Sequence, residues 1–380
     1  LYINNTYDPE IDKIDRSIEK EFGKLFNIKS YNSSLLFKPN EVLNNSGSFF
    51  KVYTPFWKNA LNKLNLRDPL PIPKIKSIYE RKILSIKQIV IANEFKIWEK
   101  KILSHFKPGE VNAREMLEKI TIKLNGYSQN RDFPIQNNTS QLSPYIARGE
   151  LSVNEIFFSI KRDKNKVSND DYIKFTSQLG WREFSYNILY NFPKLPNKNF
   201  ISKFDNFPWL KNSRYLSSWK KGFTGYPIVD AGMRELRATG YMHNRLRMIV
   251  ASFLIKNLNI TWIDGAKWFW DNLFDADIAN NSSGWQWVAG CGTDAAPYFR
   301  IFNSTLQSVR FDKDGEYIRK WVPELKDLPN KFIHSPWELT EMELLSFNVK
   351  LGKNYPYPIV DHKTTRDEAL INYKKMNLIQ

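Results

Sequence analysis

The segment 275–303 brings together acidic, amide and indole side chains at a spacing that ordinary helix packing does not require. Asp275 and Asp277 are two residues apart, two asparagines follow, and Trp285 and Trp287 are again two apart. Carboxylates and amides can bind the polar edge of a planar ring, and indoles can stack beside it. A buried polar network at the end of a helical domain is the alternative. We favour a site for a polar, planar ligand.

Three hydroxyl side chains accompany the start of a predicted helix. Thr139, Ser140 and Ser143 would stand beside the free N–H groups of its first turn, where a phosphate can bind. A plain N-cap is the alternative for these residues. Two further segments, 181–184 and the basic turn 220–227, indicate an anion site only weakly by themselves.

The elements that must position these residues are helices. The clearest helical period is an apolar stripe formed by Met242, Leu246, Ile249, Val250, Phe253, Leu254 and Leu258. Such a stripe predicts a helix face that packs in the core. Asn244, Arg247, Met248 and Ala251 fall on a second face of the same helix, which leaves them available to a ligand.

The N-terminal residues have the pattern of a fragment of an α/β unit. They predict a strand at 1–3, an amphipathic helix at 9–26 and a short strand at 33–37. One helix and two strands cannot cover their own apolar faces as an independent domain. We therefore expect that the chain has lost its true N-terminus.

The segment 38–76 is rich in Asn, Pro and Ser, which predicts a long connector without core elements. Beyond it nearly everything predicts helix, including a basic helix at 83–106 and another at 113–124. Neither a GxGxxG motif nor a P-loop occurs, so neither of these nucleotide motifs explains a ligand site.

Composition is typical of a globular protein from a reducing compartment. The 380 residues are 42% hydrophobic, and their mean hydropathy of −0.50 excludes an integral membrane protein. Cys291 is the single cysteine, which rules out an internal disulfide, and the four histidines are too scattered to predict a zinc site. We expect a cytosolic or nuclear protein without a bound metal.

The charge of the chain favours a polyanionic partner. Its formal net charge is +16, and residues 182–247 hold twelve Lys/Arg against four Asp/Glu. A solvated face is the ordinary explanation of a charge run, but such a concentration of one sign favours a polyanion. Aromatic residues make up 15% of the chain, and rings among basic side chains can stack on exposed bases. We predict contact with nucleic acid.

Seven motifs in one order resemble the DNA photolyase and cryptochrome family. They are TSQLSPY at 139–145, WREF at 181–184, GFTGYPIVDAGMR at 222–234, MHNRLRM at 242–248, DADIANN at 275–281, GWQW at 284–287 and GTDAAPYFRIFN at 292–303. The similarity extends over about residues 1–375 and is strongest over 127–335. Within the family the chain is most similar to class I cyclobutane pyrimidine dimer photolyases.

The resemblance implies a mainly α fold. An all-helical FAD-binding photolyase domain at 106–380 would follow the C-terminal remnant of an α/β, Rossmann-like antenna domain at 1–37 and an interdomain connector with a first helix at 38–105. The cofactor would be FAD, with a folate or deazaflavin antenna pigment in the full-length protein. The partner would be DNA containing pyrimidine dimers. We expect a monomer in the cytoplasm of a bacterium, associated with the nucleoid during repair.

The resemblance also implies roles for individual residues. FAD would be bound by Tyr127, Thr139, Ser140, Leu142, Ser143, Arg182, Asn244, Arg247, Asp275, Asp277 and Asn281. Trp285, Trp262 and Trp209 would carry an electron from the surface to the photo-oxidised flavin, although core packing is the ordinary role of a tryptophan. The DNA and its lesion would contact Gln178, Trp181, Asn244, Arg245, Met248 and Trp287. Lys220, Lys221 and Arg300 would be further phosphate ligands, with an internal salt bridge as the alternative for Arg300.

Gln178 is a departure from the family pattern, because dimer photolyases usually carry Glu there. Relatives that repair the (6-4) photoproduct often carry Gln, but they also place histidines at the positions of Asn244 and Met248, which this chain does not. The resulting prediction is light-dependent repair of cyclobutane pyrimidine dimers, with Gln178 and Asn281 in catalytic positions. The alternatives are a cryptochrome-type photoreceptor, a (6-4) photolyase and a helical single-strand binder without enzymatic activity. A neutral Asn281 beside the flavin and the short C-terminal end argue for repair.

Overall fold

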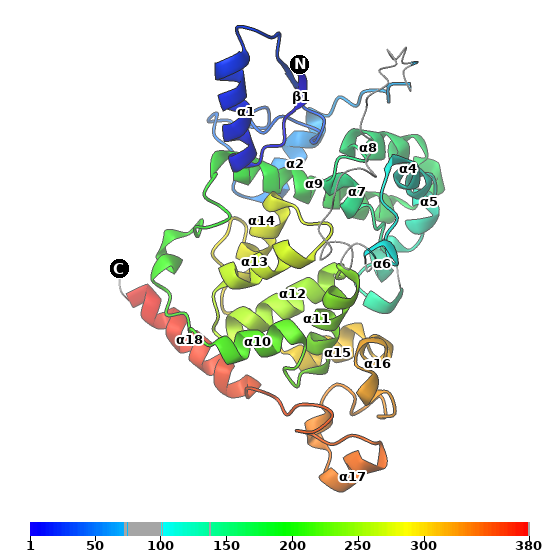
Figure 1. Ribbon diagram of the computed structural model, residues 1–380, viewed down its shortest axis with the longest axis vertical. Helices are drawn as coiled ribbons and strands as arrows, with labels where there is room; N and C mark the ends of the chain where they lie inside the picture. Colours follow the sequence, from blue (N-terminus) through cyan, green and yellow to red (C-terminus); the bar gives the residue numbers. More distant parts are fainter. Residues whose placement is uncertain (72–73, 75–99, 101, 137, 379–380) are drawn as a thin grey trace, which may run out of the picture.

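The computed structural model describes residues 1–71, 74, 100, 102–136 and 138–378, and these are mainly helical, as predicted (Figure 1). After the N-terminal elements the α-helices are α2 (Tyr53–Asn62), α4 (Glu110–Glu118), α5 (Ile120–Lys123), α6 (Tyr127–Asn130), α7 (Ser143–Ala147), α8 (Val153–Arg162), α9 (Asn169–Asn191), α10 (Ser213–Lys221), α11 (Pro227–Thr239), α12 (Asn244–Ser252), α13 (Trp262–Asn272), α14 (Ile278–Ala289), α15 (Ser304–Phe311), α16 (Glu316–Trp321), α17 (Glu341–Ser346) and α18 (His362–Leu378). The functional prediction depends on the packing of α9, α12 and α14.

The N-terminal elements are β1 (Tyr2–Asn4), α1 (Pro9–Phe22) and β2 (Lys29–Tyr31), and the two strands pair in parallel. The predicted first strand and the helix are therefore present, and the helix is one turn shorter than expected. The predicted strand at 33–37 is wrong, since the second strand lies before it. Backbone N–H groups in 33–37 bond to a glutamate of α9 instead of to a strand, so this segment docks on the helical part.

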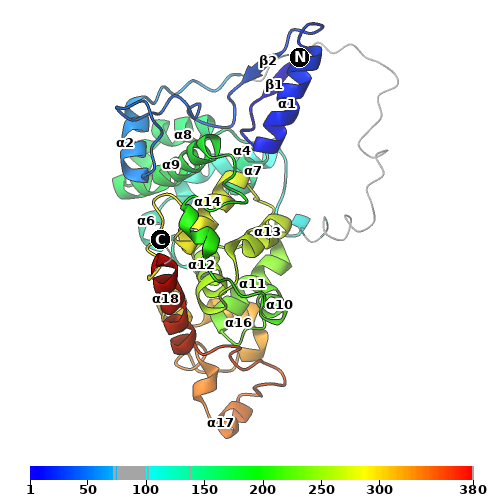
Figure 2. The ribbon, with the colours of Figure 1, turned by 90° about the vertical axis from the view of Figure 1, so that its left-hand side faces the viewer.

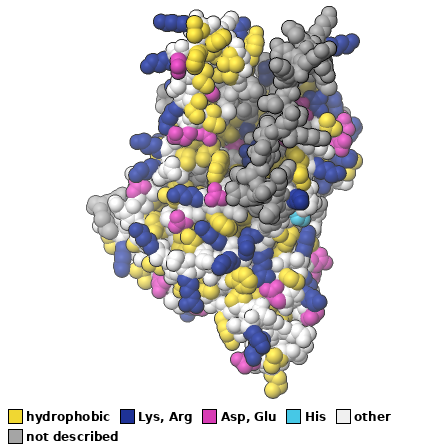
Figure 3. Space-filling model, in the orientation of Figure 1, with side chains coloured by type: hydrophobic (Ala, Val, Ile, Leu, Met, Phe, Trp, Pro, Cys, Tyr) yellow, Lys and Arg dark blue, Asp and Glu magenta, His cyan; other side chains and the backbone are white. Residues whose placement is uncertain are grey.

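One side of α1 is apolar and exposed. Ile11, Ile14 and Ile18 are 42%, 58% and 36% exposed, and no residue of α1 is buried. Figure 3 shows hydrophobic side chains gathered at the top of the molecule, over α1. The predicted apolar face is thus present, and within the described residues nothing covers it.

Helix α2 corrects the prediction of a connector without core elements. Tyr53, Phe56, Trp57 and Ala60 are buried, and α2 packs on α9 (Figure 2). These residues have the i, i+3, i+4, i+7 spacing of an amphipathic helix, which the Asn- and Pro-rich surroundings obscured. Gly180 of α9 makes room for the contact, because a Cβ there would approach the Trp57 ring to 2.6 Å.

The two predicted helices that follow have different outcomes. Most of the one at 83–106 lies outside the described residues, although residues 102 and 103 are helical. The one at 113–124 is present as two helices, α4 and α5, with Lys119 between them. The predicted apolar stripe from Met242 to Leu258 is confirmed, since all seven of its residues are fully buried.

The described residues form two hydrophobic cores. One contains the α12 stripe and its continuation as a π-helix, η5 (Phe253–Asn257), and the other is built around α2, α8 and α9. Helix α14 contributes to both, with Ala279 in the second core and Trp285 and Ala289 in the first. In Figure 1 it accordingly lies between α9 and α13. The segment that the sequence marked as a ligand site therefore lies where the cores meet.

Among the described residues no helix combines the length and the apolar character that crossing a bilayer requires. In the same residues no group of three His, Cys, Asp or Glu lies close enough together to hold a metal ion.

Candidate functional site

A cavity of about 540 Å³ opens between α9, α12 and α14, within the size range of small-molecule sites. Many of the predicted site residues line it, namely Gln178, Trp181, Arg182, Asn244, Arg245, Arg247, Met248, Asp275, Asp277, Asn281, Trp285 and Trp287. The second face of α12, with Ala251 as its fourth member, also lines the cavity as predicted. Residues far apart in the sequence are thus brought together in one place.

Arg247 and Asp275 form an ion pair in the wall of the cavity. Arg247 Nη2 donates to both carboxylate oxygens, at 3.0 and 2.9 Å, while its Nε donates to the Met242 carbonyl at 2.7 Å. Burial lowers the pKa of Arg247, but the charge and hydrogen bond of Asp275, together with the nearby Tyr241 and Glu235, outweigh burial and raise the pKa overall. Ser143 Oγ donates to Asp275 at 2.8 Å, so α7 also reaches this pair. The arrangement holds a carboxylate and a cation in fixed orientation.

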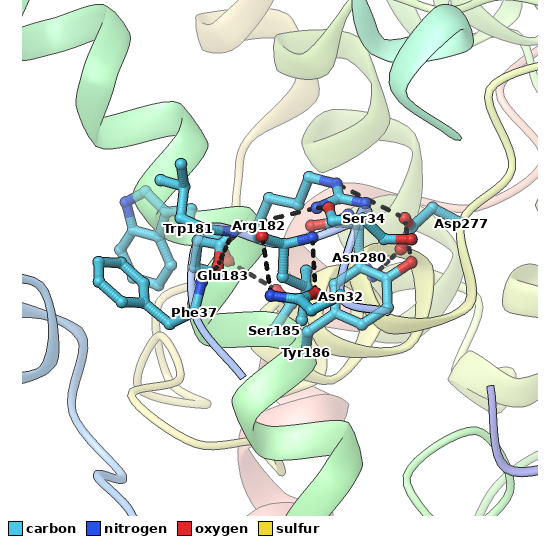
Figure 4. Close-up of polar contacts among 12 residues, drawn as sticks. Asn32, Ser34, Phe37, Trp181, Arg182, Glu183, Ser185, Tyr186, Asp277 and Asn280 are labelled. Carbon is cyan, nitrogen blue, oxygen red and sulfur yellow. Dashed lines mark hydrogen bonds and ion pairs between the residues drawn. The ribbon is translucent and has the colours of Figure 1, made fainter. Parts of the chain in front are cut away.

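Asp277 is the N-cap of α14 and is held from three sides (Figure 4). It accepts hydrogen bonds from Asn280 N and from Tyr186 Oη, each at 2.8 Å, and Arg182 Nε lies 4.0 Å away. Burial and the charge of Asp277 raise the pKa of Tyr186, which therefore stays a hydrogen-bond donor. Because both carboxylate oxygens of Asp277 already accept hydrogen bonds, the orientation of this carboxylate toward a ligand is fixed.

Arg182 and Glu183 connect the cavity wall to the N-terminal part of the chain (Figure 4). Arg182 Nη1 donates to the Ser34 carbonyl at 2.7 Å, and Glu183 Oε2 accepts from the backbone N of Leu36 and Phe37 at 3.0 and 3.3 Å. Burial raises the pKa of Glu183 to about 7. The sequence does not predict this role of Glu183, because its partners lie almost 150 positions away.

The hydroxyl side chains in the loop before α7 do not act as a plain N-cap, which was the alternative interpretation. The N-cap position is Leu142, and no side chain caps the helix. Ser140 Oγ instead accepts from Leu142 N at 3.4 Å. Neither Thr139 nor Ser140 lines the cavity, and the side chains of Leu142 and Tyr127 pack in the second core. Their predicted part in binding the FAD diphosphate stays a prediction.

The three predicted relay tryptophans have different surroundings. Trp285 is buried against the Phe269 ring, at 4.9 Å between centroids, and its Nε1 has no hydrogen-bond partner. Trp262 is fully buried and donates to Asn199 at 2.8 Å, whereas Trp209 is half-buried. Two of the three indoles are thus buried and one is partly exposed, and their electron-relay role stays a prediction.

Six of the residues predicted to meet DNA line the cavity, whereas Lys220, Lys221 and Arg300 do not. Gln178 and Arg245 already have partners within the protein. Gln178 Nε2 donates to the carbonyl of Lys174, one turn earlier on α9, at 3.2 Å. Arg245 Nη2 donates to Asp132 at 2.6 Å, and its guanidinium lies 4.3 Å from the Phe311 ring. A phosphate would therefore have to compete with Asp132 for Arg245.

Several buried polar atoms of the cavity lining lack a partner. They are Arg131 Nη1, Arg245 Nε, Ser283 Oγ and Trp285 Nε1. Unsatisfied buried donors are costly, and a polar ligand or water in the cavity would satisfy them. Together with the Arg247–Asp275 pair, they fit a large polar ring system such as a flavin.

Comparisons with known proteins agree with this site. The model of the FAD-binding domain of DNA photolyase matches residues 175–375, and the DNA photolyase model matches 1–74. The chain is 42% identical to a deoxyribodipyrimidine photo-lyase of Agrobacterium fabrum, over 97% of this chain and 78% of that one. It is 38% identical to the Escherichia coli protein of the same name, over 98% and 78%, and 38% identical to Arabidopsis thaliana cryptochrome-2, over 97% and 62%.

Solved structures give the same result. A class III photolyase from Agrobacterium tumefaciens superposes with a TM-score of 0.90 at 42% identity, covering 99% of this chain and 79% of that one. A cryptochrome from Synechocystis superposes with a TM-score of 0.83 at 32% identity, covering 97% and 78%. The assignment to class I stays a prediction, since the first of these neighbours is named class III. The chain belongs to the DNA photolyase and cryptochrome family.

Proposed function

We propose that this protein binds FAD in the cavity between α9, α12 and α14 and repairs cyclobutane pyrimidine dimers in DNA under blue light. The observation that carries the proposal is the Arg247–Asp275 pair, which shares one cavity with Asn281 and with the indoles of Trp181 and Trp287. Several relatives are named deoxyribodipyrimidine photo-lyase, and this name supports a pyrimidine dimer as the substrate. When bound in its reduced form, FAD would supply light-driven electron donation.

The residues of the chain would bind and orient the flavin. Arg247 and Asp275 would present opposite charges to its polar edge, and Asp277 would accept from it at a position fixed by Tyr186 and Asn280. Asn281 donates through Nδ2 to the Ala266 carbonyl at 2.9 Å, which fixes its amide plane. A neutral amide places no charge beside the flavin, and this suits a cofactor that must stay reduced.

The other side of the cavity would receive the damaged bases. Gln178, Trp181, Met248 and Trp287 line the cavity and would offer an amide, a thioether and two indoles to a dimer extruded from the duplex. Enzymes acting on bases extrude them in this way, and a damaged base is the least costly to extrude. We further propose that the protein acts as a monomer close to the nucleoid. We also propose that an antenna pigment accompanies FAD and that residues 53–62 belong to the helical domain.

A cryptochrome-type photoreceptor is the second candidate. It is favoured by Gln178, which lacks the negative charge usual in dimer photolyases, and by the cryptochromes among the relatives. In that case light would reduce the flavin without repair of any lesion.

The deciding experiment offers dimer-containing and (6-4)-containing oligonucleotides separately to the purified flavoprotein, in light and in darkness. We expect repair of the cyclobutane dimer but not of the (6-4) lesion, and only in light. Gln178→Glu should repair the cyclobutane dimer faster than the wild type. Flavin reduction without repair would identify a photoreceptor, and repair of the (6-4) lesion alone would refute the substrate. A purified protein without a flavin absorption spectrum would refute the cofactor.

A further inference from the structure

The Trp181 indole, on the cavity wall, is backed by a residue from outside the site. The ring of Tyr53 stacks on it with 3.8 Å between centroids and 9° between planes. Phe184 meets the same indole edge-on, at 5.8 Å and 81°. One face and one edge of Trp181 are thus occupied by protein, so a ligand can reach only the remaining surface of the ring.

Tyr53 is itself held by α9 and by the loop that follows α14. Its hydroxyl bonds to the carbonyl and to the Oγ of Ser177 on α9, both at 2.9 Å. Its backbone N, the first of α2, donates to Asp294 Oδ2 at 3.0 Å. Val52 at the N-cap gives no side-chain cap, so Asp294 replaces it. Asp294 follows Thr293, which lines the cavity from the loop after α14.

Helix α2 cannot slide along α9 to relax this stack. Trp57 lies against Gly180 so closely that a Cβ at that glycine would meet its ring at 2.6 Å. Phe184, one turn after Gly180 on α9, contacts Phe56 of α2 with 5.3 Å between ring centroids. The position of Tyr53 is therefore set by the whole α2–α9 contact and by Asp294, independently of any ligand.

We propose that Tyr53 is a positioning residue for lesion recognition, which holds the Trp181 indole in the orientation that receives the extruded dimer, and that Asp294 fixes Tyr53 for this purpose. The inference rests on the proposed function, since it takes Trp181 as a contact of the dimer. The physical reason is preorganisation: an indole that is already ordered loses less conformational entropy when a base binds. Loss of the stack should weaken dimer binding, while the flavin contacts on α12 and α14 stay intact.

The test compares binding of dimer-containing and undamaged DNA in darkness, for the flavoprotein and its variants. Tyr53→Leu removes the stack, Tyr53→Phe keeps it without the hydroxyl, and Asp294→Ala removes the cap. We expect the preference for dimer DNA to fall about three- to tenfold in Tyr53→Leu, as estimated from the strength of aromatic pairs, and less in the other two. Flavin content, the rate of flavin photoreduction and affinity for undamaged DNA should not change.

A double-mutant cycle with Trp181→Ala separates positioning from general structural support. If Tyr53 acts through Trp181, Tyr53→Leu causes no further loss of preference once the indole is gone. Equal losses in both backgrounds, or an unchanged preference in Tyr53→Leu, would overturn the inference alone. A wild-type protein without any preference for dimer DNA would overturn the proposed function, and the inference with it.

Discussion

The Arg247–Asp275 pair is the contact on which cofactor binding should depend most directly. Asp275→Asn keeps the shape of the side chain but leaves the Arg247 guanidinium without a counter-charge in the cavity wall. We expect the variant to lose flavin during purification and to be less stable by about 1–3 kcal/mol, since breaking a partly buried pair exposes one uncompensated charge. Flavin absorbance per protein and urea unfolding measure the two effects.

The matched control for this variant is an ion pair away from the cavity. Arg234 and Glu324 lie 2.7 Å apart, their side chains are 17% and 18% exposed against 24% for Arg247 and 3% for Asp275, and neither lines the cavity. Glu324→Gln should also reduce stability but should retain its flavin. Equal flavin loss in both variants would mean that general destabilisation, and not the pair, controls retention.

Glu183 should make stability depend on pH. Its pKa rises from 4.5 to about 7 on folding because the side chain is buried, so the folded state binds more protons in this range. Stability must therefore fall as the pH rises from about 4.5 to 7. Glu183→Gln keeps an acceptor for Leu36 and Phe37 without the charge, and we expect it to exceed the wild type by roughly 1–3 kcal/mol at pH 8.

Urea unfolding of both proteins at pH 5 and pH 8 measures this effect as a difference. Asp230, Glu235 and Asp312 have raised pKa values as well, through burial, and their contribution is common to the two proteins. A wild type and a Glu183→Gln variant with the same pH dependence would contradict the prediction.

At the scale of elements, two helix glycines should respond differently to alanine: Gly180 lies in the close contact of α2 and α9, whereas Gly284 lies on α14 away from that contact. Gly180→Ala would push a methyl group into the Trp57 ring and should cost about 1–3 kcal/mol of stability through overpacking. Gly284→Ala on α14 meets nothing within 4 Å and should be neutral or stabilising by up to about 1 kcal/mol, because alanine favours helix. Urea midpoints of the two variants would decide, and a tolerated Gly180→Ala would mean that α2 can move.

The sequence predicted elements whose pattern is local and continuous. The α12 stripe was found because seven apolar residues repeat at helical spacing without interruption. Helix α2 was missed because its four apolar positions lie between Asn- and Pro-rich stretches, and the second strand was placed four residues too late. The helical spacing of α2 is present in the sequence but is short, and residues 33–37 dock on α9 through Glu183, a contact that no local pattern contains.

The residues of the candidate site also fall into two groups, those that the sequence predicted and those that it did not. The lining residues on α9, α12 and α14 were selected through motifs, but their supports were not, because these come from distant positions. Tyr53 and Ser177 are 124 positions apart, Glu183 and Leu36 are 147, and Arg245 and Asp132 are 113. Only the folded chain brings such pairs together, so no spacing rule could have found them.

For the whole molecule, a net charge of +16 predicts DNA binding that weakens steeply with salt. Arg300 is exposed and has no ion pair among the described residues, so Arg300→Gln should reduce the salt slope by about 0.9, the value for one phosphate contact. Arg245→Gln should reduce it less, because Asp132 already neutralises that side chain. Titrations of undamaged DNA at several salt concentrations compare the two variants. Equal salt slopes for Arg300→Gln and Arg245→Gln would contradict the prediction.

Helix α14 has Ala279 in one core and Trp285 in the other, with the cavity alongside. A cofactor bound there would contact residues that belong to both hydrophobic cores. Without the cofactor, the two cores can unfold one after the other during denaturation. With the cofactor bound, either core can unfold only if the cofactor is released. Loading should therefore merge two melting steps into one, so that the pigment needed for catalysis also makes the protein unfold as a single unit.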